Sequence, residues 1–238
     1  ALTDEVKIRG AWSRTLDRPE LRELAPFQFT EATSLRQLVG NPQLEPAEIT
    51  SIDLRADWFP GPNELLSIGG FYKQMQNPIE QVFIAAASSA YSFQNAEEAT
   101  IYGAEIDARI GLGRLAGALA DFGVQANYSR ILSEVSVKAE GVFQPTNRDR
   151  PLEGQAPYVL NTGLTYASDA GVNAAVYYNR FGERLTAAGG SGLPDIYEQP
   201  RDAVDATVSF PLRAGLRARI KGTNLLDEEH QYLQSANG

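Results

Sequence analysis

Few side chains in this sequence could carry out covalent or metal chemistry. There is no cysteine among its 238 residues, and the one histidine, His230, lies close to the end. Without cysteine there are no thiolate nucleophiles, disulfides or cysteine-based zinc sites, and a serine–histidine–aspartate triad would depend on His230 alone. We therefore expect a protein that is not an enzyme and has no catalytic, cofactor-binding or metal-binding residues.

Three short motifs suggest binding chemistry, but each has a simpler interpretation. The glycines of Gly111–Gly117 hint at a dinucleotide loop, yet the third falls one place late, which favours a chain-reversing turn. The run Asp227–His230 offers three carboxylates and an imidazole as metal ligands, although consecutive side chains rarely point at one ion. The run Asn147–Arg150 is interpreted as a solvated charge run in a loop, with contact to a substrate as the alternative.

Paired carboxylates are the remaining candidates for catalysis. Asp53 and Asp57, like Glu105 and Asp107, would share one face of a strand. A glycosidase needs two carboxyl groups roughly 5–10 Å apart on either side of a sugar, and this spacing permits that. Arginines are interspersed with these acids, so we interpret them as members of ion-pair ladders.

Composition and hydropathy narrow the class of protein. Thirty acidic and 21 basic residues give a net charge of −9, which argues against nucleic-acid binding. No apolar run approaches the roughly 18–20 residues of a membrane helix, and residues 1–20 lack the features of a signal peptide. Strands that cross a membrane escape such a search, because they show only alternating polarity.

Alternation with a period of two is the dominant pattern. From Thr50 to Trp58 the even positions are mostly apolar, while Asp53, Arg55 and Asp57 stand between them. Repeats of this pattern predict about nine strands, most of them roughly 9–11 residues long, as a tilted membrane strand requires. The strands are expected near residues 6–12, 50–58, 66–72, 100–110, 122–128, 158–166, 172–178, 204–210 and 216–221.

The connections alternate in length. Short turns are expected at 60–63, 111–121, 168–171 and 211–215, and long irregular stretches at 15–48, 77–97, 135–157 and 182–202. A meander with short turns at one end and long loops at the other is typical of outer-membrane barrels. Aromatic residues would mark the two membrane interfaces. These are Trp58, Phe59, Phe122 and Phe210 beside short turns, and Tyr72, Tyr128, Tyr177 and Tyr178 beside long loops.

The alternation also fits a soluble β-sandwich, in which the polar face meets solvent and the apolar face packs on a second sheet. Small residues on the apolar face, such as Ala56 and Ala104, would fill such a core poorly but are tolerated by lipid. We therefore predict an all-β, antiparallel up-and-down meander that forms part of a large transmembrane β-barrel.

Five segments resemble motifs of the TonB-dependent outer-membrane receptors, in the family's order and over nearly the whole chain. They are Ser13–Leu24, Gly40–Glu48, Phe71–Ile79, Asn95–Ile106 and Lys221–Asp227. The resemblance implies a plugged barrel of about 22 strands. Residues 1–238 would form its C-terminal segment, with the plug domain and the last strand absent.

The resemblance also implies a function. The family imports scarce, bulky nutrients such as iron chelates, cobalamin or glycans through the outer membrane, with energy from TonB. The implied partners are the lipid bilayer, TonB and the plug domain through the missing N-terminal part, and a surface lipoprotein. Ligand contacts would come from Leu24–Val39, Ser88–Asn95, Val137–Arg150 and Leu185–Glu198 by position alone.

Three alternatives remain open at this point. They are a soluble β-sandwich that serves as a binding or adhesion module, a small outer-membrane barrel hydrolase, and a structural piece of a larger outer-membrane assembly.

Overall fold

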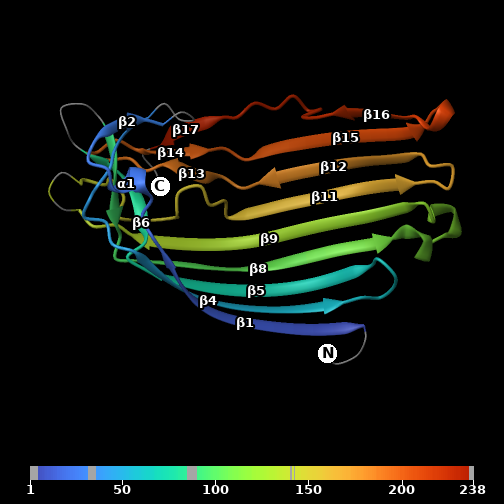
Figure 1. Cartoon of the computed structure of the whole chain (residues 1–238), viewed down its shortest axis with the longest axis horizontal. Coiled ribbons are helices and arrows are strands. Elements are labelled where there is room, and N and C mark those ends of the chain that lie inside the picture. Colours follow the sequence, from blue (N-terminus) through green and yellow to red (C-terminus); the bar gives the residue numbers. More distant parts are fainter. Residues whose placement is uncertain (1–4, 32–35, 85–89, 140, 142, 236–238) are drawn as a thin grey trace.

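The computed structural model describes residues 5–31, 36–84, 90–139, 141 and 143–235. Its main element is an antiparallel sheet in which nine strands follow one another in chain order (Figure 1). They are β1 (Val6–Asp17), β4 (Ala47–Trp58), β5 (Leu65–Gln76), β8 (Glu98–Gly111), β9 (Phe122–Ser136), β11 (Tyr158–Ala167), β12 (Asn173–Phe181), β15 (Arg201–Pro211) and β16 (Arg217–Gly222). The nine-strand meander predicted from alternation is confirmed, and several strands are longer than expected. A short strand, β10 (Asp149–Arg150), pairs with the end of β9.

The register of this sheet places the even-numbered residues of all nine strands on one face. Ile52 of β4 stands opposite Trp12 of β1 and Tyr72 of β5, and every other pair of neighbouring strands keeps the same parity. Since side chains alternate along a strand, the odd-numbered residues share the opposite face. We call the even side the apolar face and the odd side, which carries Asp57 and Arg55, the polar face.

The apolar face is uncovered. Trp12, Leu54 and Ile68 are 69%, 62% and 60% exposed. Large apolar side chains each gain roughly 1.5–3 kcal/mol when they leave water, so a sandwich would bury them under a second sheet. In the described part of the chain no such sheet covers them. Among the same residues, no helix has the length and hydropathy needed to cross a membrane.

Short turns close one end of the sheet, as predicted. The turn after β8 contains two 3₁₀ helices, η1 (Leu112–Arg114) and η2 (Gly117–Leu119), and the turn after β15 contains a third, η3 (Arg213–Gly215). The turn between β11 and β12 ends at Gly171, whose φ of 79° lies in the left-handed region that favours glycine.

The four long segments gather at the other end of the sheet. Together with the chain after β16 they form what we call the cap, defined as residues 18–46, 77–97, 137–157, 182–200 and 223–235. It contains the helix α1 (Leu21–Leu24) and two small sheets. One sheet has the order β2 (Gln28–Thr30), β3 (Gln37–Val39), β7 (Ala90–Asn95), β6 (Ile79–Ile84), and the other β13 (Arg184–Ala187), β14 (Asp195–Glu198), β17 (Tyr232–Ser235).

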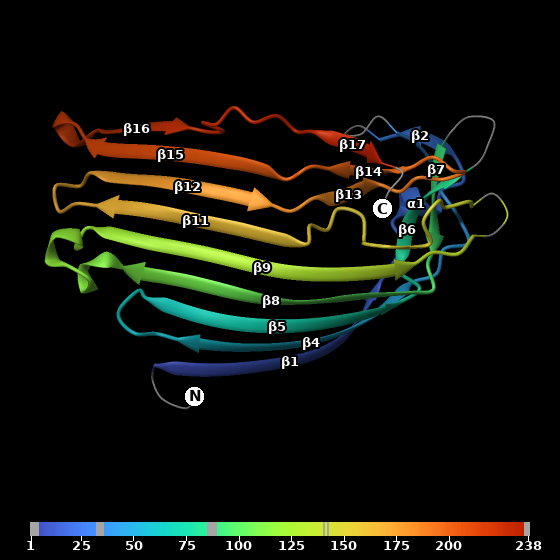
Figure 2. The same cartoon turned by 180° about the vertical axis from the view of Figure 1, so that it is seen from behind.

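The prediction that these stretches are irregular is therefore wrong. Their strands are two to six residues long, too short to show a period, and the parallel pair β3–β7 joins segments far apart in the chain. Figures 1 and 2 show β6 and β7 running across the direction of the long strands.

The core lies where the cap meets the polar face. At the cap end of the long strands the odd positions become apolar, and Ala47, Ala99 and Val135 are almost fully buried. Ala99 and Val135 pack with the cap residues Val82 and Ala96. A second cluster lies within the cap itself, around Leu38, Leu44 and Phe93. The cap thus folds over the polar face and leaves the apolar face free.

A substitution at Gly103 provides a test of this close packing on the polar face. A Cβ at this position would lie 2.4 Å from the Arg130 carbonyl oxygen and 2.7 Å from the Phe71 ring, whereas a Cβ at Gly117 would meet no atom within 4 Å. We expect Gly103→Ala to lower the stability by about 1–3 kcal/mol and Gly117→Ala to change it by less than about 0.5 kcal/mol. Thermal unfolding in detergent, followed by gel mobility, measures both. Equal melting temperatures would contradict the packing described here.

Candidate functional site: the polar face and the cap

A network of ion pairs crosses the polar face from β1 to β8. Asp57, whose side chain is 1% exposed, pairs with Arg9 and, at 2.8 Å, with Arg55. The Arg55 guanidinium also reaches Asp107 of β8 at 2.8 Å. To do so it crosses β5 at the level of Gly69, where the absence of a side chain leaves room. One arginine therefore links carboxylates on two strands that are not neighbours.

Amide side chains continue this network across the next strands. Asn127 of β9 donates to Asp107 at 2.7 Å, and Asn179 of β12 donates to Asn161 of β11, also at 2.7 Å. These residues stand directly opposite one another in the register. The interpretation of these acids as members of an ion-pair ladder is confirmed for Asp57 and Asp107, whereas among the described residues no ion pair joins Asp53 or Glu105 to the ladder. Arginine binds the carboxylates of Asp57 and Asp107. Neither of them is therefore free to act as the acid of a glycosidase.

A hollow of about 500 Å³ opens on this part of the polar face. Its polar lining includes Asp107, Arg109, Gln125, Asn127, Asn161 and Tyr177. Tyr177 was expected among the interface aromatics, and this prediction is wrong, because its odd position places it on the polar face, where its ring covers Gly163. Trp58, Phe122 and Phe210 do lie at the short-turn end of the apolar face. Tyr72, Tyr128 and Tyr178 share that face, but β9 continues to Ser136, so Tyr128 lies near its middle.

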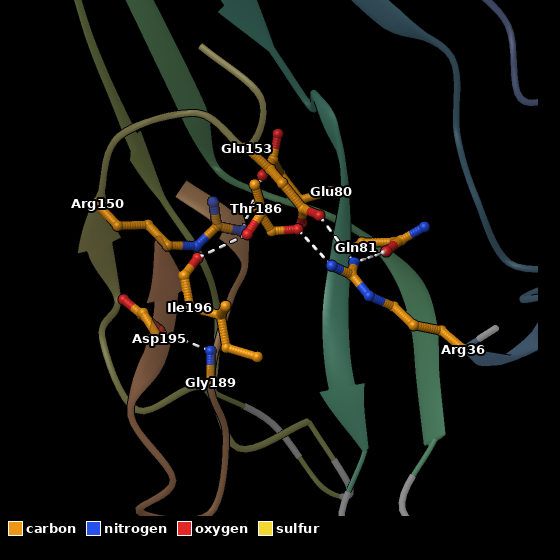
Figure 3. Close-up of polar contacts among 9 residues, drawn as sticks. All are labelled: Arg36, Glu80, Gln81, Arg150, Glu153, Thr186, Gly189, Asp195 and Ile196. Atoms are coloured by element: carbon orange, nitrogen blue, oxygen red, sulfur yellow. Dashed lines mark hydrogen bonds and ion pairs between the residues drawn. The ribbon is translucent and has the colours of Figure 1, made fainter. Parts of the chain in front are cut away.

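Buried ion pairs join the segments of the cap (Figure 3). Arg150, 1% exposed, contacts Glu80 of β6 at 2.8 Å. Nearby, the Asp195 carboxylate accepts hydrogen bonds from the Gly189 amide at 2.6 Å and from Asn147 at 2.8 Å. The prediction that Asn147–Arg150 is a solvated charge run is therefore wrong, because both of its ends bind other parts of the cap.

Arg36 contacts three other segments of the cap. Its guanidinium donates to Glu153 at 2.9 Å, to Gln81 at 3.2 Å and to the Thr186 carbonyl oxygen at 2.5 Å. It also lies over the Tyr91 ring, 5.2 Å from the centroid. The planar guanidinium carries five N–H donors in a fixed arrangement and can bind several acceptors at once. A lysine ammonium is a compact charge that does not fix the directions of its partners in this way. Sequence reasoning missed Arg36 because nothing local distinguishes it from an exposed arginine.

Burial sets the ionisation of the acids in the cap. It raises the pKa of Glu80 and of Glu153 above the usual range, although Arg150 and Arg36 act in the opposite direction. Burial would also raise the pKa of Glu198, but hydrogen bonds from His230 and Arg184 lower it overall. The distances are 2.7 Å to His230 and 2.6 Å to Arg184.

The two other motifs singled out in the sequence, Gly111–Gly117 and Asp227–His230, form a turn and contacts within the fold. Gly111–Gly117 forms the turn after β8, as expected. In the run Asp227–His230, Glu228 accepts a hydrogen bond from the Asp202 amide while His230 turns to Glu198. Within the residues that the structure describes, no group of three or more His, Asp or Glu is arranged to hold a metal ion. Of the four positional ligand segments, residues 32–35, 88–89, 140 and 142 lie outside the described residues.

Comparison with known proteins decides the family. The family model described as TonB dependent receptor-like, beta-barrel matches residues 1–225. The chain belongs to the TonB-dependent receptor β-barrel family. Members of this family are outer-membrane proteins, and their barrels have short periplasmic turns and longer extracellular loops. This sheet has a similar arrangement, with short turns at one end and the cap at the other.

Solved structures support the receptor fold. A mutant of the ferric enterobactin receptor PfeA from Pseudomonas aeruginosa aligns with a TM-score of 0.64 at 16% identity, over 96% of this chain and 34% of that one. The copper transporter OprC gives 0.71 at 16% identity, over 97% and 33%. The ferric-catecholate import receptor Fiu from E. coli K12 gives 0.67 at 14% identity, over 97% and 30%. The chain thus spans about a third of these receptors. None of the curated proteins is similar enough in sequence to count as a match.

Replacing Arg36 should loosen the receptor cap. Arg36→Ala leaves the largely buried Glu153 carboxylate without this partner, which we expect to cost about 2–4 kcal/mol, less in Arg36→Lys. Arg22→Ala is the matched control, because Arg22 and its partner Glu20 are both more than 60% exposed. Hydrogen exchange of β6 and β13 should accelerate in Arg36→Ala only. Unchanged exchange in all three variants would show that Arg36 does not hold the cap together.

Lowering the pH should destabilise the cap around Glu198. Because the pKa of this carboxyl is lowered in the folded cap, its contribution to stability is present above the ordinary glutamate range and is lost as the pH falls through the folded pKa. The protection of β14 and β17 against hydrogen exchange, relative to the intrinsic exchange rate at each pH, should therefore fall as the pH is lowered below about 4. In Glu198→Gln this loss of protection should be absent, and an identical pH profile in both proteins would contradict the assignment.

Proposed function

We propose that this chain is the C-terminal segment of the β-barrel of an outer-membrane receptor that imports a scarce, bulky nutrient with energy delivered by TonB. The observation that carries the proposal is the two-faced sheet. An uncovered apolar face suits contact with lipid, while the ion pairs and amides of the opposite face suit a wet lumen.

The edges of the sheet support a longer barrel. Among the described residues, β1 pairs with β4 and β16 with β15, so these two strands form the edges of the sheet. In lipid every backbone polar group needs a partner, and closed barrels supply one. Further strands of the same receptor, together with a plug domain in the lumen, would complete this segment. TonB acting on the plug and a surface lipoprotein acting on the cap are the proposed partners.

The similar solved proteins are described as a ferric enterobactin receptor, a ferric-catecholate import receptor and a copper transporter. They favour a metal-bearing nutrient over a glycan as the transported class. No covalent chemistry is proposed, because Asp57 and Asp107 on the polar face are bound by arginine, and the cap acids Glu80, Glu153 and Glu198 are bound by arginine or histidine. An uncovered apolar face also argues against a soluble adhesion module.

The first test is the native polypeptide in detergent-extracted outer membranes, compared with and without boiling. We expect a heat-modifiable band well above 25.9 kDa, the mass of this chain. A species of 25.9 kDa that stays soluble without detergent would overturn the proposal.

A charge placed on the apolar face provides a second test. Ile68→Arg should lower the stability in lipid by about 2–4 kcal/mol, because Ile68 lies between the levels of Trp58 and Tyr72. Gln74→Arg, on the same face of β5 but beyond Tyr72, should cost at most about 1 kcal/mol. Urea unfolding in vesicles measures both variants. Equal costs would mean that this face does not lie in a bilayer.

A further inference from the structure

The apolar face repeats one pair of residue types on three of the strands that run toward the cap. On β1, β9 and β12 an aromatic residue is followed two positions later by an arginine. The pairs are Trp12 with Arg14, Tyr128 with Arg130, and Tyr178 with Arg180. Residues two apart share a face of a strand, so each arginine lies on the apolar face, nearer the cap than its aromatic neighbour. Aromatic side chains mark the boundary between membrane and water, which places these arginines at headgroup level when the face contacts lipid.

Two of these arginines converge on the start of β11. Arg130 of β9 donates from Nη1 to the Pro157 carbonyl oxygen at 3.0 Å, and Arg180 of β12 donates from Nε to the Tyr158 hydroxyl at 3.1 Å. Tyr158 stands opposite Arg130 in the register, and its ring lies over Gly182 at the end of β12. Because β9 and β12 flank β11, the two guanidinium groups approach adjacent residues of one strand from its two sides.

The positive charge at this point exceeds the negative charge. Arg180 pairs with Asp202, which stands opposite it on β15, but Arg130 is exposed and no acid of the described residues forms an ion pair with it. Glu134, the next acid on this face of β9, lies four residues, roughly 13 Å, further along the strand. We call Arg130, Tyr158, Arg180 and Asp202 the basic cluster. Two arginines and one aspartate give it a net charge of +1.

An unpaired charge on a face that contacts lipid needs a partner. A charged side chain in the hydrocarbon region is costly, and arginines near the ends of membrane segments reach the interface instead. Each guanidinium carries five N–H donors, so Arg130 and Arg180 both keep donors beyond the contacts described above. The partner that a bilayer offers at this level is the headgroup of an anionic lipid.

A phosphate group fits this set of donors. Guanidinium groups bind phosphate through parallel N–H···O hydrogen bonds, and phosphate has enough oxygens to accept from two arginines. The Tyr158 hydroxyl accepts from Arg180, which leaves its own hydrogen to be donated to the same phosphate. On the side away from the cap, Tyr128 and Leu160 stand opposite each other on the apolar face and offer a surface for acyl chains. A free anion would gain nothing from that surface.

We propose that the basic cluster binds the phosphate headgroup of an anionic membrane lipid, whose acyl chains lie along the apolar face. This inference rests on the proposed function, because it requires the apolar face to contact a bilayer. It goes beyond nutrient import, since the cluster lies on the face opposite to the ion-pair network and takes no part in binding a nutrient there.

Three lipids with the same dioleoyl chains test the headgroup preference. Phosphatidic acid carries a phosphate monoester, phosphatidylglycerol an anionic phosphodiester, and phosphatidylcholine a headgroup without net charge. The full-length receptor in a non-ionic detergent is mixed with equal amounts of all three, and native mass spectrometry counts the lipids that it retains. We expect phosphatidic acid to be retained at least about fivefold more than phosphatidylcholine, with phosphatidylglycerol between them.

Variants then locate the preference. Arg130→Gln and Arg180→Gln should each lower the ratio of phosphatidic acid to phosphatidylcholine at least about threefold, and Arg130→Lys, which keeps the charge, should lower it less. Arg219→Gln is the matched control, because Arg219 is an exposed arginine on the polar face of β16, and it should leave the ratio unchanged. If Arg180→Gln fails to fold because Asp202 loses its partner, Arg130→Gln still tests the site.

Three outcomes would overturn the inference. The first is equal retention of the three lipids, and the second is the same fall in the ratio for Arg219→Gln as for Arg130→Gln. The third is displacement of phosphatidic acid by excess inorganic phosphate but not by chloride at equal ionic strength, which would assign the cluster to free phosphate. Failure of the proposed function is distinguished by the heat-modifiable band and by the comparison of Ile68→Arg with Gln74→Arg, neither of which depends on the basic cluster.

Discussion

The parity of the strand register is the constraint on which the rest of the structure depends. In eight successive antiparallel pairs, even-numbered residues stand opposite even-numbered residues, so a pattern written along one strand is continued by its neighbours. A slip of one residue between β4 and a neighbouring strand would place Asp57 and Arg55 beside the exposed leucines and isoleucines of the apolar face. The ladder on the polar face reinforces this register, because Arg55 can bridge Asp57 and Asp107 only when Gly69 lies between them.

The same parity explains why the cap folds inward. Along most of each strand the odd positions are polar, but at the cap end they become Ala47, Met75, Ala99 and Val135. Those side chains lose contact with water only if the long segments turn over the polar face, where the cluster around Val82 receives Met75, Ala99 and Val135. Buried ion pairs then tie the segments to one another. Packing brings the cap together, and the pairing of Arg150 with Glu80 and of Arg36 with Glu153 selects one arrangement of it.

The sheet could be predicted from the sequence and the cap could not, for physical reasons. A nine-residue alternation such as Thr50–Trp58 has one stable solution at a surface between polar and apolar surroundings, so period, turns and faces follow from it. The cap strands are too short to repeat any pattern. The partners of Arg36 stand 45, 117 and 150 residues away in the chain, and no local signal encodes such contacts. Tyr177 shows a narrower failure, since its neighbour Tyr178 has the same residue type and only the register separates their faces.

The long sequence separation of the Arg36 contacts has a consequence for how the molecule is assembled. Contacts between distant segments form only after the intervening chain is in place, because closing a long loop costs entropy that shorter contacts do not. Arg36 meets Thr186 only when β4, β5, β8, β9, β11 and β12 have been laid side by side. We therefore expect the cap contacts of Arg36 to form after these six strands have paired. Because the chain contains no cysteine, no disulfide formation accompanies this step.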